Sequence, residues 1–192
     1  MSTINFATRE INFKIVYYGP GMSGKTTNLV YMYSRLTDDR KGQLITLDTE
    51  QERTLFFDFF PLELGEIQGF KTRFHLYTVP GQVYYEASRR IVLSGADGVV
   101  FVADSQASRR PDNVESLRGM LENMASYGLQ PGPVPVVLQY NKRDMDGILT
   151  VEDLDADLRA DSWPRFASVA TQGAGVLDTV RTVMKEVLSR FE

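Results

Sequence analysis

The chain contains no cysteine and a single histidine, and both scarcities limit its chemistry. Without cysteine there is no disulfide, no thiolate nucleophile and no attachment site for a prenyl or palmitoyl group. His75 has no second metal ligand nearby in the sequence, so we expect a packing or surface residue without a catalytic role. Thiol and disulfide chemistry are therefore excluded.

Long apolar runs and blocks of basic charge are also absent. No stretch approaches the about 18 apolar residues of a membrane-spanning helix, and the first residues lack the blocks of a signal peptide. The 21 Lys and Arg residues are dispersed and the net charge is −4, so no nucleic-acid footprint is expected. We expect a cytoplasmic protein without a direct membrane anchor, which reaches any membrane through partners.

What the sequence does contain is an alternation of strand-like and helix-like segments. Its 192 residues suffice for one domain, 1–192. The runs 99–102 and 134–138 are nearly all apolar, as in parallel strands covered on both faces. We predict an α/β domain with a mostly parallel twisted sheet of about six strands, one antiparallel edge strand and helices on both faces. The strand candidates are Ile11–Tyr18, Leu44–Leu47, Phe70–Val79, Gly98–Ala103, Val134–Tyr140 and Phe166–Val169.

Helices are expected at four places. The first is Thr27–Leu36, and the clearest periodicity runs from Val176 to Phe191. Thr150 followed by Asp153 resembles a capping box at the start of another helix. A further helix stops near Gly128, and its expected inner face consists of Val114, Leu117, Met120, Leu121 and Met124.

The antiparallel edge is expected from a hairpin. Leu62–Ile67 and Phe70–Val79 are spaced to pair through a turn at Gln68 and Gly69. Gly65 and the glutamate after it interrupt the apolar face of the first strand. The register of this pair is therefore weakly specified.

The segment Gly19–Thr26 spells G-x-x-x-x-G-K-T between a strand-like run and a helix-like stretch, which is the context of a phosphate-binding P-loop. Its backbone N–H groups are expected to converge on the α- and β-phosphates, aided by the helix dipole. Lys25 would reach the β- and γ-phosphates, and the Thr26 hydroxyl would ligate Mg²⁺. The predicted phosphate-binding residues of this segment are Gly19, Gly21, Met22, Ser23, Gly24, Lys25, Thr26 and Thr27.

The segment Asn141–Asp144 reads N-K-x-D directly after a strand-like run. A carboxylate accepts two hydrogen bonds side by side, which suits the N1–H and amine of guanine and not adenine. Asp144 is therefore predicted to select GTP over ATP. Asn141 would tie this loop to the P-loop, Lys142 would lay its stem over the purine with its ammonium in solvent, and Ala170 would offer its N–H to guanine O6. By itself a charged loop after a buried strand explains the motif equally well, and the P-loop at the same sheet edge favours guanine.

Two further segments flank the expected phosphate site. In the segment 78–82, the backbone N–H of Gly81 would contact the γ-phosphate and Gln82 would orient the attacking water. Thr54 is placed to complete Mg²⁺ coordination when the γ-phosphate is present. A supplied arginine accelerates phosphoryl transfer ~10³–10⁵-fold, so Arg53 is either an arginine finger in cis, productive once a partner holds the loop, or a solvated arginine among acidic residues.

These elements, in this order, resemble the Ras-like small GTPases across nearly the whole chain. Gly19–Asn28, Arg53–Pro61 and Phe70–Gln82 look like the mutual gliding protein A (MglA-type) subgroup of bacteria. The resemblance implies a GTP/GDP switch that sets cell polarity or surface motility, recruitment to a cell pole by partners, and a Roadblock-type GTPase-activating protein. By resemblance the site residues are Lys25 and Thr26 for phosphate and Mg²⁺, Thr54 in the first switch, Gln82 for water, and Asn141, Lys142, Asp144 and Ala170 for guanine.

One position departs from the common Ras-like pattern. Most members have an aspartate, which orients a Mg²⁺-bound water, where this chain has Thr78; the MglA-type subgroup shares the threonine. The leading interpretation is a switch that hydrolyses GTP slowly. The alternative is a GTP-holding scaffold with negligible hydrolysis, which Thr78 favours and which Arg53 and Gln82 count against. An ATP-dependent kinase or transporter is disfavoured by Asp144.

Two stretches lie outside these motifs. Arg109 and Arg110 form a short basic pair before a helix, for which we expect a solvated surface position. Leu55–Leu62 is apolar apart from Asp58, whereas a half-buried strand would alternate. This stretch is therefore either core beneath the switch or a partly exposed surface for a partner.

Overall fold

The computed structural model describes residues 3–35, 45–46, 58–81, 86–159 and 162–191, in which strands and helices alternate along the chain. The strands are β1 Thr3–Asn5, β2 Glu10–Tyr18, β3 Ile45–Thr46, β4 Asp58–Ile67, β5 Phe70–Thr78, β6 Gly98–Asp104, β7 Val136–Asn141 and β8 Arg165–Ala167. The helices are α1 Lys25–Arg35, α2 Glu86–Leu93, α3 Arg110–Ser126, α4 Val151–Leu158 and α5 Val176–Ser189, and a 3-10 turn, Ala107–Arg109, precedes α3.

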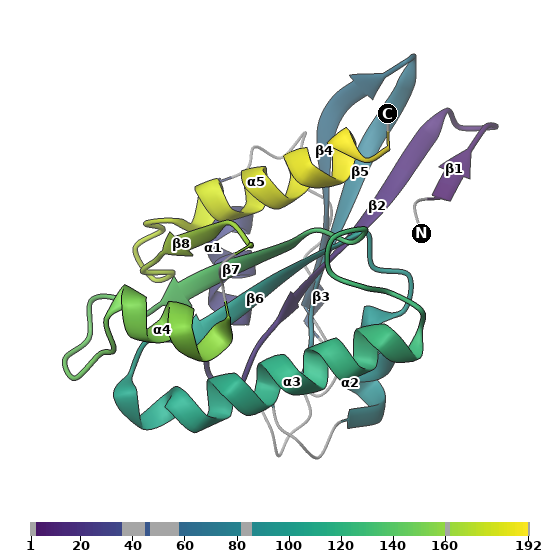
Figure 1. Cartoon of the computed structure of the whole chain (residues 1–192). Coiled ribbons are helices and arrows are strands. Elements are labelled where there is room, and N and C mark those ends of the chain that lie inside the picture. The colour runs from purple at the N-terminus through teal and green to yellow at the C-terminus, as the bar shows by residue number, and fades with distance from the viewer. Residues whose placement is uncertain (1–2, 36–44, 47–57, 82–85, 160–161, 192) are drawn as a thin grey trace.

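The strands of the described residues form one sheet in the order β3-β4-β5-β2-β6-β7-β8, with β1 added beside β2 (Figure 1). The five strands from β5 to β8 in this order are mutually parallel. The mostly parallel sheet is therefore confirmed. It has eight strands in the described residues where about six were expected, because the short β1 was not predicted and β4 was counted only as the added edge strand.

The predicted hairpin of β4 and β5 is present. The two strands pair antiparallel through a turn at Gln68 and Gly69. The register shifts between Glu63 and Glu66, where the sequence had indicated a weakly specified pairing. The antiparallel edge of the sheet is therefore confirmed, and within the described residues the two-residue β3 pairs with the far side of β4 and lies outermost.

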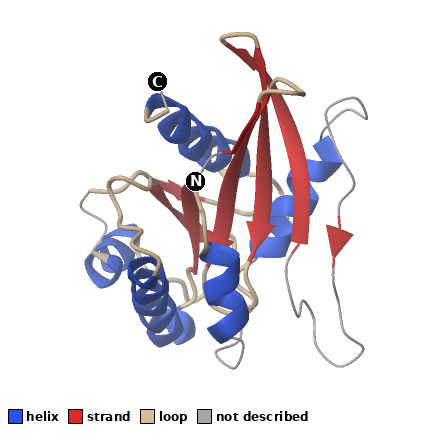
Figure 2. Cartoon of the chain, turned by 90° about the vertical axis from the view of Figure 1, so that its right-hand side faces the viewer, coloured by secondary structure: helices blue, strands red, loops and turns tan. Residues whose placement is uncertain are grey.

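The helices cover both faces of the sheet (Figure 2). One buried cluster lies between the sheet and helices α1 and α5, and a second lies between the sheet and α2, α3 and α4. The alternation along β2 divides its side chains between them: Phe13, Ile15 and Tyr17 belong to the first cluster, and Val16 and Tyr18 to the second. Two covered faces explain the nearly continuous apolar runs of β6 and β7.

Two helix expectations need correction. Helix α2 was not predicted, because its pattern is inverted: Ile91 is 67% exposed and Arg89 is 3% exposed. In α3, Val114 was placed on the inner face, yet it is 43% exposed and the polar Asn113 beside it is buried. In contrast, the capping box of Thr150 and Asp153 at the start of α4 is present with both of its hydrogen bonds.

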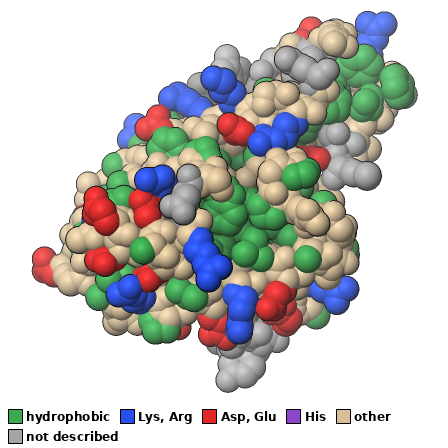
Figure 3. Space-filling view, viewed as in Figure 1, with side chains coloured by type: hydrophobic (Ala, Val, Ile, Leu, Met, Phe, Trp, Pro, Cys, Tyr) green, Lys and Arg blue, Asp and Glu red, His purple; other side chains and the backbone are tan. Residues whose placement is uncertain are grey.

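The surface seen in Figure 3 carries Lys and Arg side chains interspersed with Asp and Glu, and hydrophobic side chains gather at its upper right end. In Figure 1 this end holds the tips of the β1–β2 and β4–β5 hairpins. Phe6, which follows β1, is 75% exposed and lies edge-on to Phe70, with ring centroids 5.7 Å apart. None of the helices within the described ranges combines the length and apolar character that a membrane span requires.

Candidate functional site

The segment Gly19–Thr26 joins the carboxyl end of β2 to α1, at the edge where the parallel strands end. Sterics require two of its glycines. Gly19 has φ +143°, and a Cβ there would lie 2.2 Å from the carbonyl oxygen of Val102. Gly24 has φ +99°, and a Cβ there would lie 2.2 Å from Nδ2 of Asn141. The loop is thus held between β6 and the N-K-x-D segment.

Lys25 begins α1, and its ammonium lies within this loop. The residue is only 6% exposed, and Nζ donates to the carbonyl oxygens of Gly19 at 3.1 Å and Pro20 at 2.7 Å. A buried ammonium at a helix N-terminus favours an anion through both its charge and the helix dipole. The donor set and the glycine backbone therefore fit the phosphate groups of a nucleotide.

Mg²⁺ at such a site would depend on few protein ligands. The described residues contain no group of three or more His, Cys, Asp or Glu placed to hold a metal ion. Mg²⁺ in phosphoryl-transfer sites keeps several waters and binds through one or two side chains plus phosphate oxygens. Thr26, in the first turn of α1, fits that need. Of the other residues predicted here, Thr54, Arg53 and Gln82 lie outside the described residues.

The backbone after β5 reaches the P-loop. A Cβ on Gly81 would lie 2.3 Å from Cα of Gly21 and 3.1 Å from Nζ of Lys25, so only glycine fits at this contact. Thr78, at the end of β5, is 1% exposed. The segment that precedes Gln82 is therefore packed directly on the predicted phosphate loop.

Asn141, the last residue of β7, connects three loops. Its Nδ2 donates to the carbonyl oxygen of Ser23 at 2.8 Å, so the predicted tie between the N-K-x-D segment and the P-loop is present. Its Oδ1 accepts from the backbone N–H of Ala170 at 2.9 Å and from Oγ of Ser168 at 3.1 Å. The N–H of Ala170, which was predicted to meet guanine O6, thus donates to Asn141 in this structure.

The next residues of the motif differ in exposure. Lys142 has φ +66°, and its Nζ lies 2.7 Å from Oδ2 of Asp104, so its ammonium is paired and not in solvent as expected. Arg143 steadies the loop by donating to the carbonyl oxygen of Leu149 at 2.7 Å. Asp144 is exposed, which leaves its carboxylate accessible for the predicted guanine contact.

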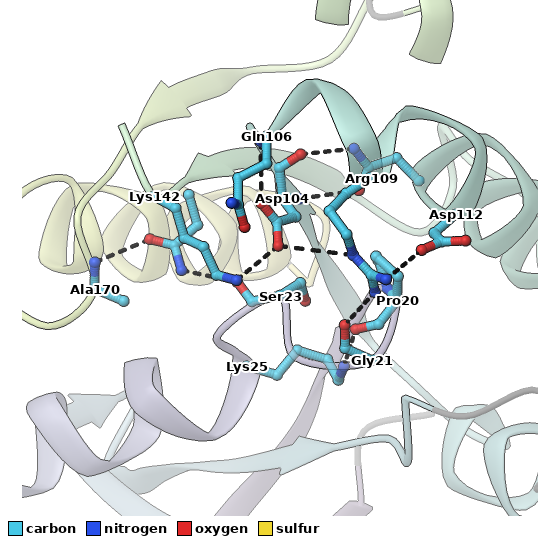
Figure 4. A network of polar contacts seen from close by, with 12 residues as sticks. Pro20, Gly21, Ser23, Lys25, Asp104, Gln106, Arg109, Asp112, Lys142 and Ala170 are labelled. Carbon is cyan, nitrogen blue, oxygen red and sulfur yellow. Dashed lines mark hydrogen bonds and ion pairs between the residues drawn. The ribbon is translucent and has the colours of Figure 1, made fainter. Parts of the chain in front are cut away.

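Sequence reasoning missed Asp104, the last residue of β6 (Figure 4). It is 0% exposed, its Oδ1 accepts from the backbone N–H of Gln106 at 3.1 Å, and Lys142 pairs with its Oδ2. The side chain of Asn113 in α3 makes two hydrogen bonds to the backbone of Asp104. Its Oδ1 accepts from the Asp104 N–H at 2.9 Å, and its Nδ2 donates to the Asp104 carbonyl at 2.8 Å. A charged residue ending an apolar strand at the same sheet edge was the available signal.

Arg109 was expected in solvent, and this prediction was wrong. Its Nη2 donates to the carbonyl oxygen of Gly21 in the P-loop at 2.8 Å, and its side chain is 33% exposed (Figure 4). Arg110, its neighbour, is 48% exposed and pairs with Asp157 of α4 at 2.6 Å. The two arginines of the pair therefore have different surroundings, which adjacency in the sequence does not reveal.

Buried polar residues fix helix α1 to the sheet. Asn28 is 0% exposed and donates to the carbonyl oxygen of Gly24 at 2.9 Å. Its Oδ1 accepts from Nε2 of Gln139 at 2.9 Å, and the same nitrogen donates to Thr179 Oγ1 of α5 at 3.1 Å. Hydrogen bonds in such an interior specify one arrangement, because an unpaired polar group there is costly.

Tyr18 lies at the base of the P-loop, directly before Gly19, and burial raises the pKa of its hydroxyl. The guanidinium of Arg89 lies 4.6 Å from the Tyr18 ring centroid. Asn123 donates to the Tyr18 hydroxyl at 3.2 Å and to Glu86 at 2.8 Å. Helix α2, which follows the segment of Gln82, is thereby anchored to the strand that leads into the P-loop.

Comparison with known proteins gives matches along the full length. No protein-family model matches the chain. It is 56% identical over 192 residues to the mutual gliding-motility protein MglA of Myxococcus xanthus (strain DK1622), covering 100% of this chain and 98% of that protein. It is 25% identical to ADP-ribosylation factor-like protein 6 of Caenorhabditis briggsae and 24% identical to that of Caenorhabditis elegans. These two alignments cover 97% and 100% of this chain and 93% and 94% of those proteins.

Proposed function

Because this chain belongs to the Ras-like small GTPases of the MglA type, we propose that it is a molecular switch that binds GTP, hydrolyses it slowly and binds effectors in the GTP state. One observation carries the proposal: Asn141 joins the carbonyl of Ser23 in the P-loop to the backbone of Ala170. A phosphate-binding motif and a guanine motif thus adjoin at one sheet edge. A guanine nucleotide carries both the phosphates and the guanine base that these two motifs would bind.

The residues of the predicted nucleotide site have distinct roles in this proposal. The loop N–H groups and Lys25 balance the charge of the β- and γ-phosphates, and Asp144 accepts hydrogen bonds from guanine. The carboxylate of Asp104 holds the ammonium of Lys142 at 2.7 Å, which fixes the stem that faces the purine. Bound Mg²⁺ would neutralise charge on the phosphates, with Thr26 and Thr54 as its protein ligands.

Hydrolysis in this proposal depends on two residues that lie outside the described residues, Gln82 and Arg53. Gln82 follows the Gly81 contact with the P-loop and would orient the attacking water. Arg53 would act as an arginine finger in cis once a partner of the Roadblock type holds its loop. Without that partner the rate stays low.

The process controlled is inferred from the relative. The Myxococcus xanthus protein is named for mutual gliding motility. For the present chain we propose control of cell polarity or surface motility through effectors that recognise the GTP state. Partners would recruit the protein to a cell pole.

A scaffold that holds GTP without hydrolysing it is the second candidate, and Thr78 favours it. A buried threonine ends β5 where most Ras-like proteins carry a carboxylate. Loss of a group that orients metal-bound water weakens metal affinity. The scaffold would bind GTP as tightly as the switch and differ only in turnover.

Competition between nucleotides tests the guanine assignment. With Mg²⁺ present, unlabelled GTP should displace a fluorescent GDP analogue at least about a hundredfold better than ATP does, because adenine cannot satisfy the Asp144 carboxylate. Asp144→Ala should weaken GTP binding, whereas Asp146→Ala, which removes another exposed carboxylate two residues on, should not. Equal displacement by ATP, or equal affinity of the two variants, would contradict the assignment.

A further inference from the structure

The guanidinium of Arg109, which was not predicted to contact the P-loop, binds a loop carbonyl and a carboxylate with different nitrogens. Arg109 ends the 3-10 turn before α3 and is 88 residues away from Gly21 in the sequence. Its Nη2 donates to the Gly21 carbonyl oxygen at 2.8 Å, and its Nη1 pairs with the carboxylate of Asp112. Figure 4 shows the guanidinium between this carboxylate, Asp104 and the loop.

The Gly21 carbonyl belongs to the same rigid peptide unit as the N–H of Met22. In a trans peptide these two groups point in opposite directions, so a donor that fixes the carbonyl also fixes the direction of the N–H. Met22 has φ +63° and is 83% exposed, so its side chain does little to stabilise a left-handed backbone that is unfavourable for a non-glycine residue. The contact with Arg109 offsets that cost.

The charge of Arg109 is largely balanced by its own neighbours. Asp112 pairs with Nη1, and Oδ2 of Asp104 lies 4.0 Å from Nε. The same Oδ2 holds the Lys142 ammonium at 2.7 Å. The guanidinium therefore adds little net positive charge for a phosphate, and its contribution is geometric. Asp104 meanwhile links the arginine behind the P-loop to the lysine of the guanine motif.

We propose that Arg109 is a positioning residue of the nucleotide site, which holds the Gly21–Met22 peptide so that the Met22 N–H is directed at the β-phosphate before the nucleotide binds. The proposal rests on the proposed function and extends it to a residue outside the motifs. It assigns Arg109 an effect on the phosphates and none on the base. A Cβ on Gly81 would lie 2.3 Å from Cα of Gly21, so the held peptide lies between the 3-10 turn of Arg109 and the segment that leads to Gln82.

The test compares GDP with GMP, which lacks the β-phosphate. Arg109→Met keeps the apolar stem and removes all donors, and Arg110→Met makes the same change at the neighbouring arginine, which pairs with Asp157 and not with the P-loop. Arg109→Met should weaken GDP binding about tenfold, as loss of one charge-assisted hydrogen bond predicts, and leave GMP binding unchanged. Arg110→Met should change neither.

Arg109→Lys provides a second variant should Arg109→Met fail to fold. It keeps the charge but cannot serve Gly21 and both carboxylates at once, so weaker GDP binding is again expected. Unchanged GDP binding in either folded variant, or equal loss of GDP and GMP binding, would overturn the proposal. Wild-type protein that binds no GDP would instead overturn the proposed function and this inference with it.

Discussion

Gly24 is the residue at which the phosphate loop meets the guanine motif. With φ +99° and a hypothetical Cβ 2.2 Å from Asn141 Nδ2, it admits no side chain without moving that amide. We predict that Gly24→Ala lowers GDP affinity by at least about tenfold, because Asn141 would lose its hydrogen bonds to Ser23 and Ala170. Isothermal titration with GDP measures the change.

Gly128→Ala is the matched control for this variant. Gly128 has φ +69°, and a Cβ there meets nothing within 4 Å, so the substitution adds left-handed strain without a contact. It should cost about 1 kcal/mol of stability and leave GDP affinity unchanged. If both variants bound GDP equally well, the junction at Gly24 would be unimportant for the site.

At the residue scale the sequence predicted the motifs and missed what supports them. The spacing of glycines, Lys25 and Asn141 carries a mechanism that can be read without coordinates. Asp104 and Arg109 carry no such spacing, since each acts through a contact between segments far apart in the chain. The head of Lys142 was misplaced for the same reason, because its partner is set by the fold.

At the scale of strands, His75 of β5 gives the pairing with β2 a pH dependence. Its Nε2 donates to Oδ1 of Asn12 at 2.7 Å. Burial, and next the charge of Arg73, lower the pKa of His75 below its ordinary 6.5, which Glu10 partly opposes. The unfolded chain therefore binds a proton at His75 more readily than the folded protein does. The contribution of His75 to the stability of the fold is complete above pH 6.5 and is lost as the pH falls below it.

Urea unfolding between about pH 7 and about pH 5 tests this dependence. We predict that the free energy of unfolding of the wild type decreases as the pH is lowered. It should decrease less in His75→Gln, whose amide keeps a donor but does not titrate. Identical pH profiles for the two proteins would show that the environment of His75 does not affect its protonation.

Helices were predicted well where the buried face is apolar and poorly where polar side chains are buried. Helix α5 follows its periodicity, with Val176, Val180, Val183 and Val187 buried. In α2, which was not predicted, the buried Arg89 donates to Oγ of Ser116 at 3.0 Å, so polarity does not mark the exposed face of this helix. In α3 the hydrogen bonds of the buried Asn113 to the backbone of Asp104 place Asn113 on the inner face, which leaves Val114 exposed.

For the whole molecule, the parallel sheet accounts for the position of the site. The loops after β2, β5, β6, β7 and β8 leave the same edge, because parallel strands end together. Motif order along the sequence therefore predicted which loops meet. The groups proposed for hydrolysis, Arg53 and Gln82, depend on a partner in our account, and a single sequence does not contain the partner's contacts.

Single-turnover hydrolysis of GTP by the purified chain with Mg²⁺ tests the switch most directly, with and without a Roadblock-type partner. We predict a rate far below about 1 s⁻¹ for the chain alone, a large stimulation by the partner, and no stimulation of Arg53→Ala. A rate near or above about 1 s⁻¹ without the partner would indicate a self-sufficient enzyme. That rate, or unchanged stimulation of Arg53→Ala, would contradict a switch that waits for its activator.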